Sequence, residues 1–270
     1  MTRMARVLLI QPEVNFERTY PLGLAYIAGH LRRAGVEVDG VDLRLDRAGL
    51  RRALGSRSYD VVGISAYSSN LAPSLAAAAE VRRRQPLALS VVGGPHVTLT
   101  GELPGGDGLW DVLVRGDGEQ PMLALASGER AGPGIVAAGG APDAGIHLHT
   151  ELEQLDFPDR RVFPVETYSD AALKRGRWPA VSASRGCPRD CAYCSASALS
   201  GGRHRPRRVE AVVEELRQLR ADHGVDGVLL EDDSLFVDRP WATALFEAIA
   251  RAELGLTFEL PNGVDPMLLD

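Results

Sequence analysis

Three cysteines lie close together in the chain and could share one metal centre. Cys187, Cys191 and Cys194 form the pattern C-x3-C-x2-C, directly after a predicted strand over Pro179–Ser184. Thiolates are soft ligands that suit iron–sulfur clusters or zinc. A cluster held by only three cysteines leaves one iron open to bind a substrate or cosubstrate. A structural zinc site needs a fourth protein ligand, for which His204 is the nearest candidate, and thiols without a metal are the third alternative.

Polar side chains also end the two strands predicted after the cysteines. Glu231, Asp232 and Asp233 are adjacent at the end of one strand, and Asn262 follows the next. Adjacent carboxylates repel each other, which is unfavourable for folding and favours a functional reason for the three acids. A solvated acidic loop is the alternative.

The N-terminal half of the chain alternates short apolar runs with stretches of helical periodicity. This pattern predicts an α/β domain, flavodoxin-like or Rossmann-like, in which helices cover both faces of a parallel sheet. Runs such as VVGIS are apolar throughout, as expected of strands that are buried on both faces. The predicted strands are Ala5–Gln11, Val36–Asp42, Asp60–Ser65, Leu89–Gly93 and Asp111–Arg115, and helices are predicted over Leu22–Ala34, over Leu71–Arg84 and from Gln120.

Small and polar residues gather where these strands end. In parallel sheets, ligands bind beyond the carboxyl ends of the strands, so four such loops favour a crevice for a large ligand. Ordinary turn residues are the alternative. A nicotinamide site is disfavoured because no G-x-G-x-x-G follows the first strand. The candidate binding residues are Pro12, Ser65, Tyr67, Ser68, Ser69, Asn70, Gly93, Gly94, His96, Gly116, Asp117, Gly118 and Glu119.

The alternating pattern is interrupted once, which predicts two domains. We expect a first domain over 1–150, with short turns or a small hairpin near Gly128–Gly145, and a proline-containing linker over 151–178. Residues 179–270 then supply about three strand–helix units of a parallel barrel, the last one incomplete. Its predicted elements are the strands Pro179–Ser184, Val225–Glu231 and Leu256–Leu260 and the helices Val209–His223 and Pro240–Ala252.

Composition and charge are those of an ordinary globular protein. The hydrophobic fraction is 45% and the net charge is −6, so no nucleic-acid surface is indicated. The basic run Arg203–Arg208 is short and is interpreted as a solvated loop or as a contact for an anionic group. No apolar stretch approaches the roughly 20 residues that cross a membrane, and the N-terminal apolar run is too short for a signal peptide. We therefore expect a cytoplasmic protein whose cysteines stay reduced.

The cysteine segment resembles the radical S-adenosylmethionine (SAM) superfamily. The resemblance extends to Ser184-Arg185-Gly186-Cys187-Pro188, to the preceding strand and to the aromatic Tyr193 before the last cysteine. It implies a [4Fe–4S] cluster on the three cysteines, whose fourth iron chelates SAM and whose electron cleaves SAM to a 5′-deoxyadenosyl radical. By the same resemblance, Tyr193 lies against the adenine, with packing of the loop as its alternative role. The acids Glu231, Asp232 and Asp233, and Asn262, then line the SAM site.

The first domain resembles the cobalamin-binding domains of cobalamin-dependent radical SAM enzymes. The matching pieces are Pro21-Leu22-Gly23, Asp42, the VVGIS and VVGGPH strands and the RGDGEQP turn, and the resemblance spans about residues 5–265. It implies that Ser65, Gly93 and Gly94 receive the nucleotide tail of cobalamin, and that Tyr67–Asn70 lie near the lower face of the corrin. No histidine follows the first strand, so no cobalt ligand is expected from that loop. His96 is expected to contact the tail or to cap the next segment, with cobalt ligation as the alternative.

The resemblance implies a methyltransferase that acts on an unactivated carbon or phosphorus centre of a small molecule or peptide. Methylcobalamin would donate the methyl group, the radical would abstract hydrogen from the substrate, and an external flavodoxin or ferredoxin would supply electrons. The alternatives are a cobalamin-dependent cyclase or rearrangement enzyme, a non-catalytic cobalamin or cluster carrier, and a zinc-binding regulatory protein. No single catalytic side chain is indicated. About three barrel units indicate a trimmed enzyme or a partial protein that needs a partner to complete its barrel.

Overall fold

The computed structural model describes residues 4–13, 20–105, 108–140, 145–152, 155–168 and 178–265. The chain divides into two compact units. Unit 1 is built mainly from Pro21–Leu148 and Asp156–Phe163, and unit 2 mainly from Pro164 onward. The segment that the sequence predicts as a linker is therefore shared between the two units. Among the described residues, no helix combines the length and the hydropathy needed to cross a membrane.

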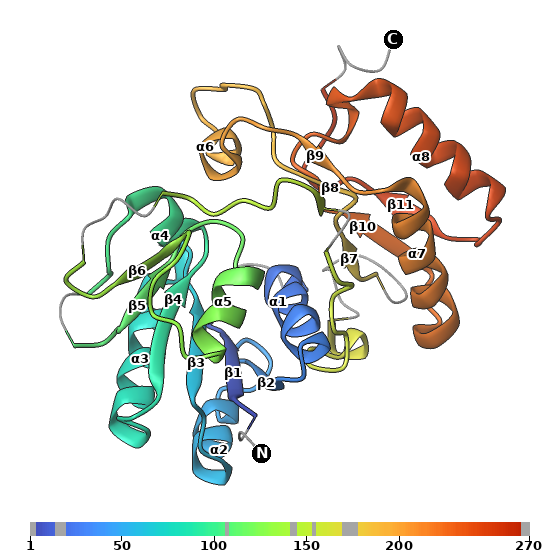
Figure 1. The fold of residues 1–270 in the computed structure, drawn as a ribbon. Helices are drawn as coiled ribbons and strands as arrows, with labels where there is room; N and C mark the ends of the chain where they lie inside the picture. Colours follow the sequence, from blue (N-terminus) through green and yellow to red (C-terminus); the bar gives the residue numbers. More distant parts are fainter. Residues whose placement is uncertain are drawn as a thin grey trace. The chain divides into compact units, whose positions relative to one another are not determined.

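Unit 1 contains a six-stranded sheet in the order β2-β1-β3-β4-β5-β6, in which every pair except β5–β6 is parallel (Figure 1). The parallel part, 2-1-3-4-5, has the flavodoxin-like order, so the predicted fold class is confirmed. The antiparallel β6 lies within the segment predicted to form turns or a hairpin. The strands are β1 (Arg6–Gln11), β2 (Glu37–Asp42), β3 (Val61–Ser65), β4 (Leu89–Gly93), β5 (Val112–Val114) and β6 (Ile135–Ala137).

Helices lie on both faces of this sheet. α2 and α3 pack together and against β2 and β3, whereas α1 and α5 pack against each other, with α1 on β1 and β2. The sequence analysis predicts α1, α3 and α5 but misses α2 and the short α4. The bounds are α1 (Leu22–Arg33), α2 (Gly49–Ser56), α3 (Leu71–Arg84), α4 (Pro95–Thr100) and α5 (Glu119–Ala126), and a 3-10 turn, η1, covers Ser68–Asn70.

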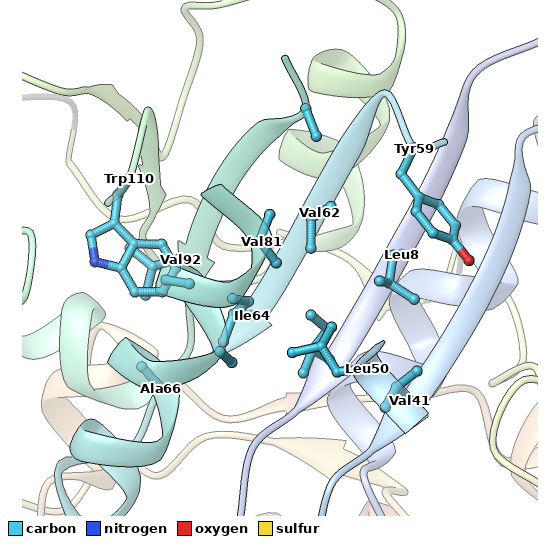
Figure 2. Close-up of a cluster of buried hydrophobic side chains, with 14 of the residues drawn as sticks. Leu8, Val41, Leu50, Tyr59, Val62, Ile64, Ala66, Val81, Val92 and Trp110 are labelled. Atoms are coloured by element: carbon cyan, nitrogen blue, oxygen red, sulfur yellow. The ribbon is translucent and has the colours of Figure 1, made fainter. Parts of the chain in front are cut away.

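The apolar core under α2 and α3 fixes the register of the strands. Alternate residues of β1 and β3, such as Leu8 and Ile64, face the same side of the sheet and meet Leu50 of α2 and Val81 of α3 (Figure 2). Trp110 closes one side of the cluster, and its indole N–H donates to the Pro104 carbonyl at 2.8 Å. A one-residue slip of a strand would exchange these buried side chains for those of the other face.

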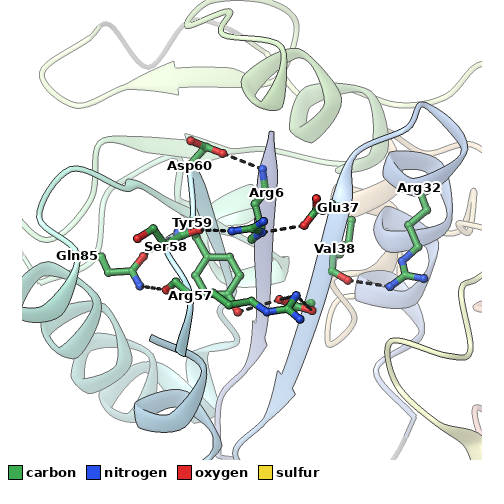
Figure 3. A network of polar contacts seen from close by, with 10 residues as sticks. Arg6, Arg32, Glu37, Val38, Arg57, Ser58, Tyr59, Asp60 and Gln85 are labelled. Carbon is green, nitrogen blue, oxygen red and sulfur yellow. Dashed lines mark hydrogen bonds and ion pairs between the residues drawn. The ribbon is translucent and has the colours of Figure 1, made fainter. Parts of the chain in front are cut away.

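The amino ends of the strands are closed by a polar network (Figure 3). The Arg6 backbone N–H donates to the Asp60 carboxylate at 2.8 Å, and its guanidinium donates to Glu37 at 2.8 Å. Tyr59 donates from its hydroxyl to Asp39 at 2.9 Å. Side chains therefore link β1, β2 and β3 at the amino edge of the sheet. Ligands of such sheets bind at the opposite edge, beyond the carboxyl ends of the strands.

The segment Asp156–Phe163 packs on α1 and β2 of unit 1. The Asp159 N–H donates to the Ala25 carbonyl at 2.8 Å, and the Asp156 carboxylate lies 3.0 Å from His30 Nδ1. This approach needs glycine in the helix, because a Cβ on Gly29 would lie 2.1 Å from the Phe157 carbonyl oxygen. Part of the predicted linker is thus an ordered strap on unit 1.

Unit 2 contains a three-stranded parallel sheet in the order β11-β10-β7 and a small antiparallel pair, β8–β9. The predicted single strand Pro179–Ser184 is wrong in detail, because the chain leaves β10 after Val181 and pairs with β9 from Ser184. The elements are β7 (Ala180–Val181), β8 (Ser184–Arg185), α6 (Ala196–Ser200), β9 (Arg205–Pro206), α7 (Val209–His223), β10 (Gly227–Leu230), α8 (Arg239–Arg251) and β11 (Thr257–Glu259), with 3-10 turns η3 (Val165–Tyr168) and η4 (Leu235–Val237).

Candidate functional site

The three cysteines lie on the loop between β8 and α6 and form no disulfide. Cys187 and Cys191 are partly exposed and Cys194 is exposed. The Cys194 sulfur accepts an N–H from Ala196 at 3.5 Å, and the Cys194 N–H donates to the Cys191 carbonyl at 2.9 Å. Within the described ranges, no three His, Cys, Asp or Glu side chains already converge in a metal-binding arrangement. The loop therefore offers three accessible thiols. Hydrogen bonds hold its backbone, but the three sulfur atoms do not converge on one point.

Gly186 and Ser200 hold the start of the cysteine loop. Gly186 has a φ of 88°, and a Cβ at this position would lie 2.3 Å from the Arg203 carbonyl oxygen and 2.4 Å from Ser200 Cβ. The buried Ser200 hydroxyl accepts the Cys187 N–H at 3.3 Å and donates to the Ala196 carbonyl at 2.8 Å. Only glycine allows the loop to pass so close to α6 at this point.

Asp232 binds the backbone that leads into this loop. Its carboxylate accepts the Ala183 N–H at 3.2 Å, the Ser184 hydroxyl at 2.6 Å and the Ser184 N–H. The side chain comes from the end of β10, and the residue is only 5% exposed. Burial raises the pKa of the Asp232 carboxyl from 3.8 to about 6, although the Ser184 and Ala183 donors act in the opposite direction.

The neighbouring polar residues continue this arrangement. The exposed Asp233 accepts the Gly186 N–H at 3.0 Å. Asn262, after β11, donates from its side-chain amide to the Asp232 carbonyl at 3.3 Å. The Glu231 N–H donates to the Val181 carbonyl at 2.9 Å. The structure therefore brings Asp232, Asp233 and Asn262 together at the start of the cysteine loop, while the Glu231 backbone pairs with β7. The Asp232 carboxylate is engaged by Ala183 and Ser184 instead of being left open to a ligand.

Two other expectations for this region can be compared with the structure. Tyr193 is 93% exposed, so the alternative that it packs the loop has no support. His204 stacks edge-on against Trp241 with ring centroids 5.7 Å apart, and burial lowers the pKa of its imidazole. His204 therefore has a packing role, and it joins no metal-binding group in the described part of the chain.

The interpretation of Arg203–Arg208 as a solvated or anion-binding run is wrong for two of its arginines. Arg205 and Arg207 are buried. Arg207 pairs with the buried Glu215 of α7 at 2.7 Å and donates to the Ser182 carbonyl at 2.8 Å, while Arg205 donates to the His149 carbonyl at 2.9 Å. The sequence could not reveal this, because the carbonyl and carboxylate partners lie in other segments of the fold.

In unit 1 the loops after β3 and β4 meet at the carboxyl edge of the sheet, next to the switch point between β1 and β3. The Ala66 N–H donates to the Gly93 carbonyl at 2.8 Å, and the His96 N–H donates to the Ala66 carbonyl at 3.0 Å. Ser68 Oγ lies 2.9 Å from His96 Nδ1. These contacts join three of the residues predicted to bind cobalamin, Ser68, Gly93 and His96, through Ala66.

The predicted residues in these two loops have different environments. Asn70 is fully buried and accepts the Tyr67 N–H at 2.7 Å, which gives it a role in shaping the turn, whereas Tyr67 is 44% exposed. Gly94 has a φ of 101°, and a Cβ there would lie 2.9 Å from the Ala66 carbonyl oxygen and 3.2 Å from Ser65 Oγ. The prediction misses that Gly94 is needed for the close approach of two loops.

The Gly116–Glu119 turn is tightly packed. A Cβ on Gly116 would lie 2.0 Å from the His147 carbonyl oxygen, and one on Gly118 would lie 2.7 Å from Ile27 Cδ1. The buried Thr98, which the sequence analysis does not single out, accepts the Gly116 N–H at 3.0 Å and donates to the Gly94 carbonyl at 2.9 Å. Thr98 therefore links the loops after β4 and β5.

Comparison with known proteins identifies both units. A model of the B12 binding domain matches residues 16–126, and a model of the radical SAM superfamily matches residues 181–269. The first match covers β2 to β5 of the flavodoxin-order sheet, and the second begins within β7 and includes the three-cysteine loop. The chain therefore contains a B12 binding domain followed by a radical SAM domain, and the cofactors of these two domains are cobalamin, SAM and a [4Fe–4S] cluster.

Individual relatives agree with this assignment. The hopanoid C-3 methylase of Methylococcus capsulatus is 31% identical over 94% of this chain and 50% of its own length. The anaerobic magnesium-protoporphyrin IX monomethyl ester cyclase of Rubrivivax gelatinosus is 26% identical over 93% of this chain and 48% of its own. The chain spans about half the length of these relatives.

A solved structure shows the same fold. The radical SAM methyltransferase TsrM from Kitasatospora setae, with tryptophan and a SAM analogue bound, superimposes with a TM-score of 0.73 over 92% of this chain and 51% of its own, at 21% identity. At this identity the similarity supports the fold of the chain and leaves its substrate open.

The residues of both sites fit these cofactors. Three thiols on one accessible loop, one of which already accepts an N–H on its sulfur, match the donor set of a three-cysteine cluster. At the carboxyl edge of unit 1, Tyr67, Ser68 and Ser69 are exposed and Gly93 is partly exposed, so the polar groups of these loops are accessible to a ligand.

Proposed function

We propose that the chain carries the cofactor-binding part of a cobalamin-dependent radical SAM methyltransferase that acts on an unactivated carbon or phosphorus centre. The observation that carries the proposal is the loop with Cys187, Cys191 and Cys194, which is held at its start by the carboxylates that end the next barrel strand. When bound, the cluster and SAM would supply a radical that abstracts hydrogen, and cobalamin would supply a methyl group.

The side chains of the chain then have defined binding tasks. The three cysteines would hold the cluster, while Tyr193, Glu231, Asp233 and Asn262 would line the SAM site around it. In unit 1, the residues proposed to contact cobalamin are Pro12, Ser65, Tyr67, Ser68, Ser69, Gly93, Gly94 and His96. Asn70 and Gly116–Glu119 would shape the loops that carry them.

The proposal extends to the setting of the protein. We infer a small-molecule or peptide substrate, a flavodoxin or ferredoxin as one-electron donor and a reducing, cytoplasmic location, because an accessible thiolate cluster requires reducing conditions. The methylase relative supports methyl transfer, whereas the cyclase relative favours a second candidate function, radical cyclisation. Product analysis with isotopically labelled SAM separates the two, because only methyl transfer places the labelled methyl group in the product.

The first test is the metal content of the full chain after anaerobic reconstitution with iron, sulfide and hydroxocobalamin. We expect about four iron and one cobalt per chain, and loss of iron in Cys187→Ala, Cys191→Ala and Cys194→Ala. His204→Gln is the matched control, since a zinc site with His204 as fourth ligand would lose its metal in this variant and a three-cysteine cluster would not. Zinc alone, or no metal, would contradict the proposal.

A further inference from the structure

We propose that Asp232 is a positioning residue of the cluster loop: its carboxylate sets the backbone path that presents Cys187. The inference rests on the proposed cluster site. It assigns Asp232 a different task from SAM binding and concerns a contact between two segments that are 48 residues apart in sequence.

The hydrogen bonds of Asp232 support this task. One carboxylate oxygen accepts the Ala183 N–H, and the other accepts both the N–H and the hydroxyl of Ser184. Both oxygens are therefore engaged, and the residue is almost completely buried. A carboxylate in this state is not available to bind the amino group of a ligand, but it fixes the chain where it changes partners from β10 to β9.

The effect on Cys187 follows from the short distance along the chain. Arg185 pairs with Arg205 in β8–β9, and the Gly186 N–H donates to Asp233 at 3.0 Å. Asp232 thus holds Ala183 and Ser184, and Asp233 holds Gly186, in the segment immediately before Cys187. The Cys187 N–H donates to the hydroxyl of Ser200, a residue of α6.

Chemistry explains why a carboxylate stands at this position. Three donors converge on Asp232, so the acceptor must offer two oxygens and no N–H or O–H directed at them. A carboxylate accepts only, whereas an amide of equal size places an NH2 group against at least one donor. Asp232→Asn therefore keeps the volume of the side chain and breaks the contact with the segment before Cys187.

The test uses the full chain, reconstituted anaerobically with iron and sulfide. For the wild type and for Asp232→Asn we would measure iron per chain, the electron paramagnetic resonance (EPR) spectrum and midpoint potential of the reduced cluster, and SAM affinity from the SAM-induced change in that spectrum. We expect a folded variant whose cluster has an altered spectrum and a potential shifted from that of the wild type, and whose SAM affinity is about 10-fold weaker, the size typical of lost outer-shell contacts to a metal site.

Two further variants make the result specific. Ser184→Ala removes only the hydroxyl that donates to Asp232 at 2.6 Å and should shift the same readouts by less; it decides the question if Asp232→Asn does not fold. Asp159→Asn is the matched control, because Asp159 is a buried carboxylate that accepts a backbone N–H, from Arg161 at 2.9 Å, but lies in unit 1. It should change the stability of the protein and leave the cluster spectrum as in the wild type.

The outcomes separate this inference from the proposed function. A wild-type chain that takes up no iron would overturn both. A wild-type cluster accompanied by an Asp232→Asn cluster of identical spectrum, potential and SAM affinity would overturn the positioning role alone. The same holds if the variant merely loses iron in proportion to its unfolded fraction.

Discussion

Single residues in this protein are constrained mainly where two loops approach each other. Gly186 and Gly94 combine a positive φ with a space that admits no Cβ, and both stand beside residues proposed to bind a cofactor. Asp232 is constrained differently. Its burial favours the neutral carboxyl, whereas its hydrogen-bond donors favour the charged carboxylate. At this scale, therefore, two glycines and one buried carboxyl determine the backbone path of the proposed binding loops.

Gly186→Ala should be far more destabilising than Gly202→Ala. Both glycines have a positive φ, 88° and 67°, but a Cβ on Gly202 meets only Ser197 Oγ at 3.7 Å. We expect a loss of about 1 kcal/mol of unfolding free energy for Gly202→Ala and about 2–4 kcal/mol for Gly186→Ala, with loss of iron in the latter only. Denaturant unfolding and iron analysis measure the two effects, and equal losses would show that the close contact with Arg203 and Ser200 is unimportant.

Asp232 should make stability depend on pH. Its pKa is raised from 3.8 to about 6 in the folded protein, so between these values the folded state keeps a proton that the unfolded state releases. The wild-type apoprotein should therefore lose stability relative to Asp232→Asn as pH rises through this range, by on the order of 2–3 kcal/mol, and the difference should be constant above it. Urea unfolding of both proteins at several pH values checks this. A difference that does not vary with pH would mean that the carboxyl is ionised throughout.

At the scale of elements, the strands were much easier to predict from the sequence than the contacts between them. Apolar runs identify β1, β3, β4 and β5 because burial on both faces demands such runs, whereas β2, with the sequence EVDGVD, is identified by alternation. α2 was missed because its sequence, GLRRALGS, is short and has no side-chain cap, and α4 was missed because Pro95 was interpreted as part of a loop. The cysteine pattern identified the cluster loop. The engagement of Asp232 with Ser184 could not be predicted, because nothing in the local sequence relates residues so far apart.

The strap of Asp156–Phe163 on α1 should depend on one helical glycine. Gly29→Ala places a methyl group against the Phe157 carbonyl, so we expect a loss of about 1–3 kcal/mol and faster amide hydrogen exchange at Asp159, whose N–H binds Ala25. Gly23→Ala, in the same helix but with nothing within 4 Å of the added Cβ, should leave stability unchanged or raise it by less than about 1 kcal/mol. Unchanged exchange at Asp159 in Gly29→Ala would contradict the role of this contact.

At the scale of the whole molecule, the residues proposed to bind cobalamin belong to unit 1 and the three cysteines belong to unit 2. We predict that the cofactors load independently. Gly94→Val, which forces the loop after β4 away from Ala66, should lower cobalt content several-fold at unchanged iron content, and Cys191→Ala should do the reverse. Metal analysis of the two variants checks this, and parallel loss of both metals in either variant would show that the sites are coupled.

The bond between Asp232 and Ser184 also has a consequence for the order of events during synthesis. The cysteines leave the ribosome before Asp232, whose carboxylate holds a residue made 48 positions earlier. The loop therefore lacks this restraint until β10 has been translated and has paired with β7. A cluster delivered to the nascent chain before that moment would meet thiols on a loop that still lacks the Asp232 restraint, so the finished loop can form only after β10 has been made.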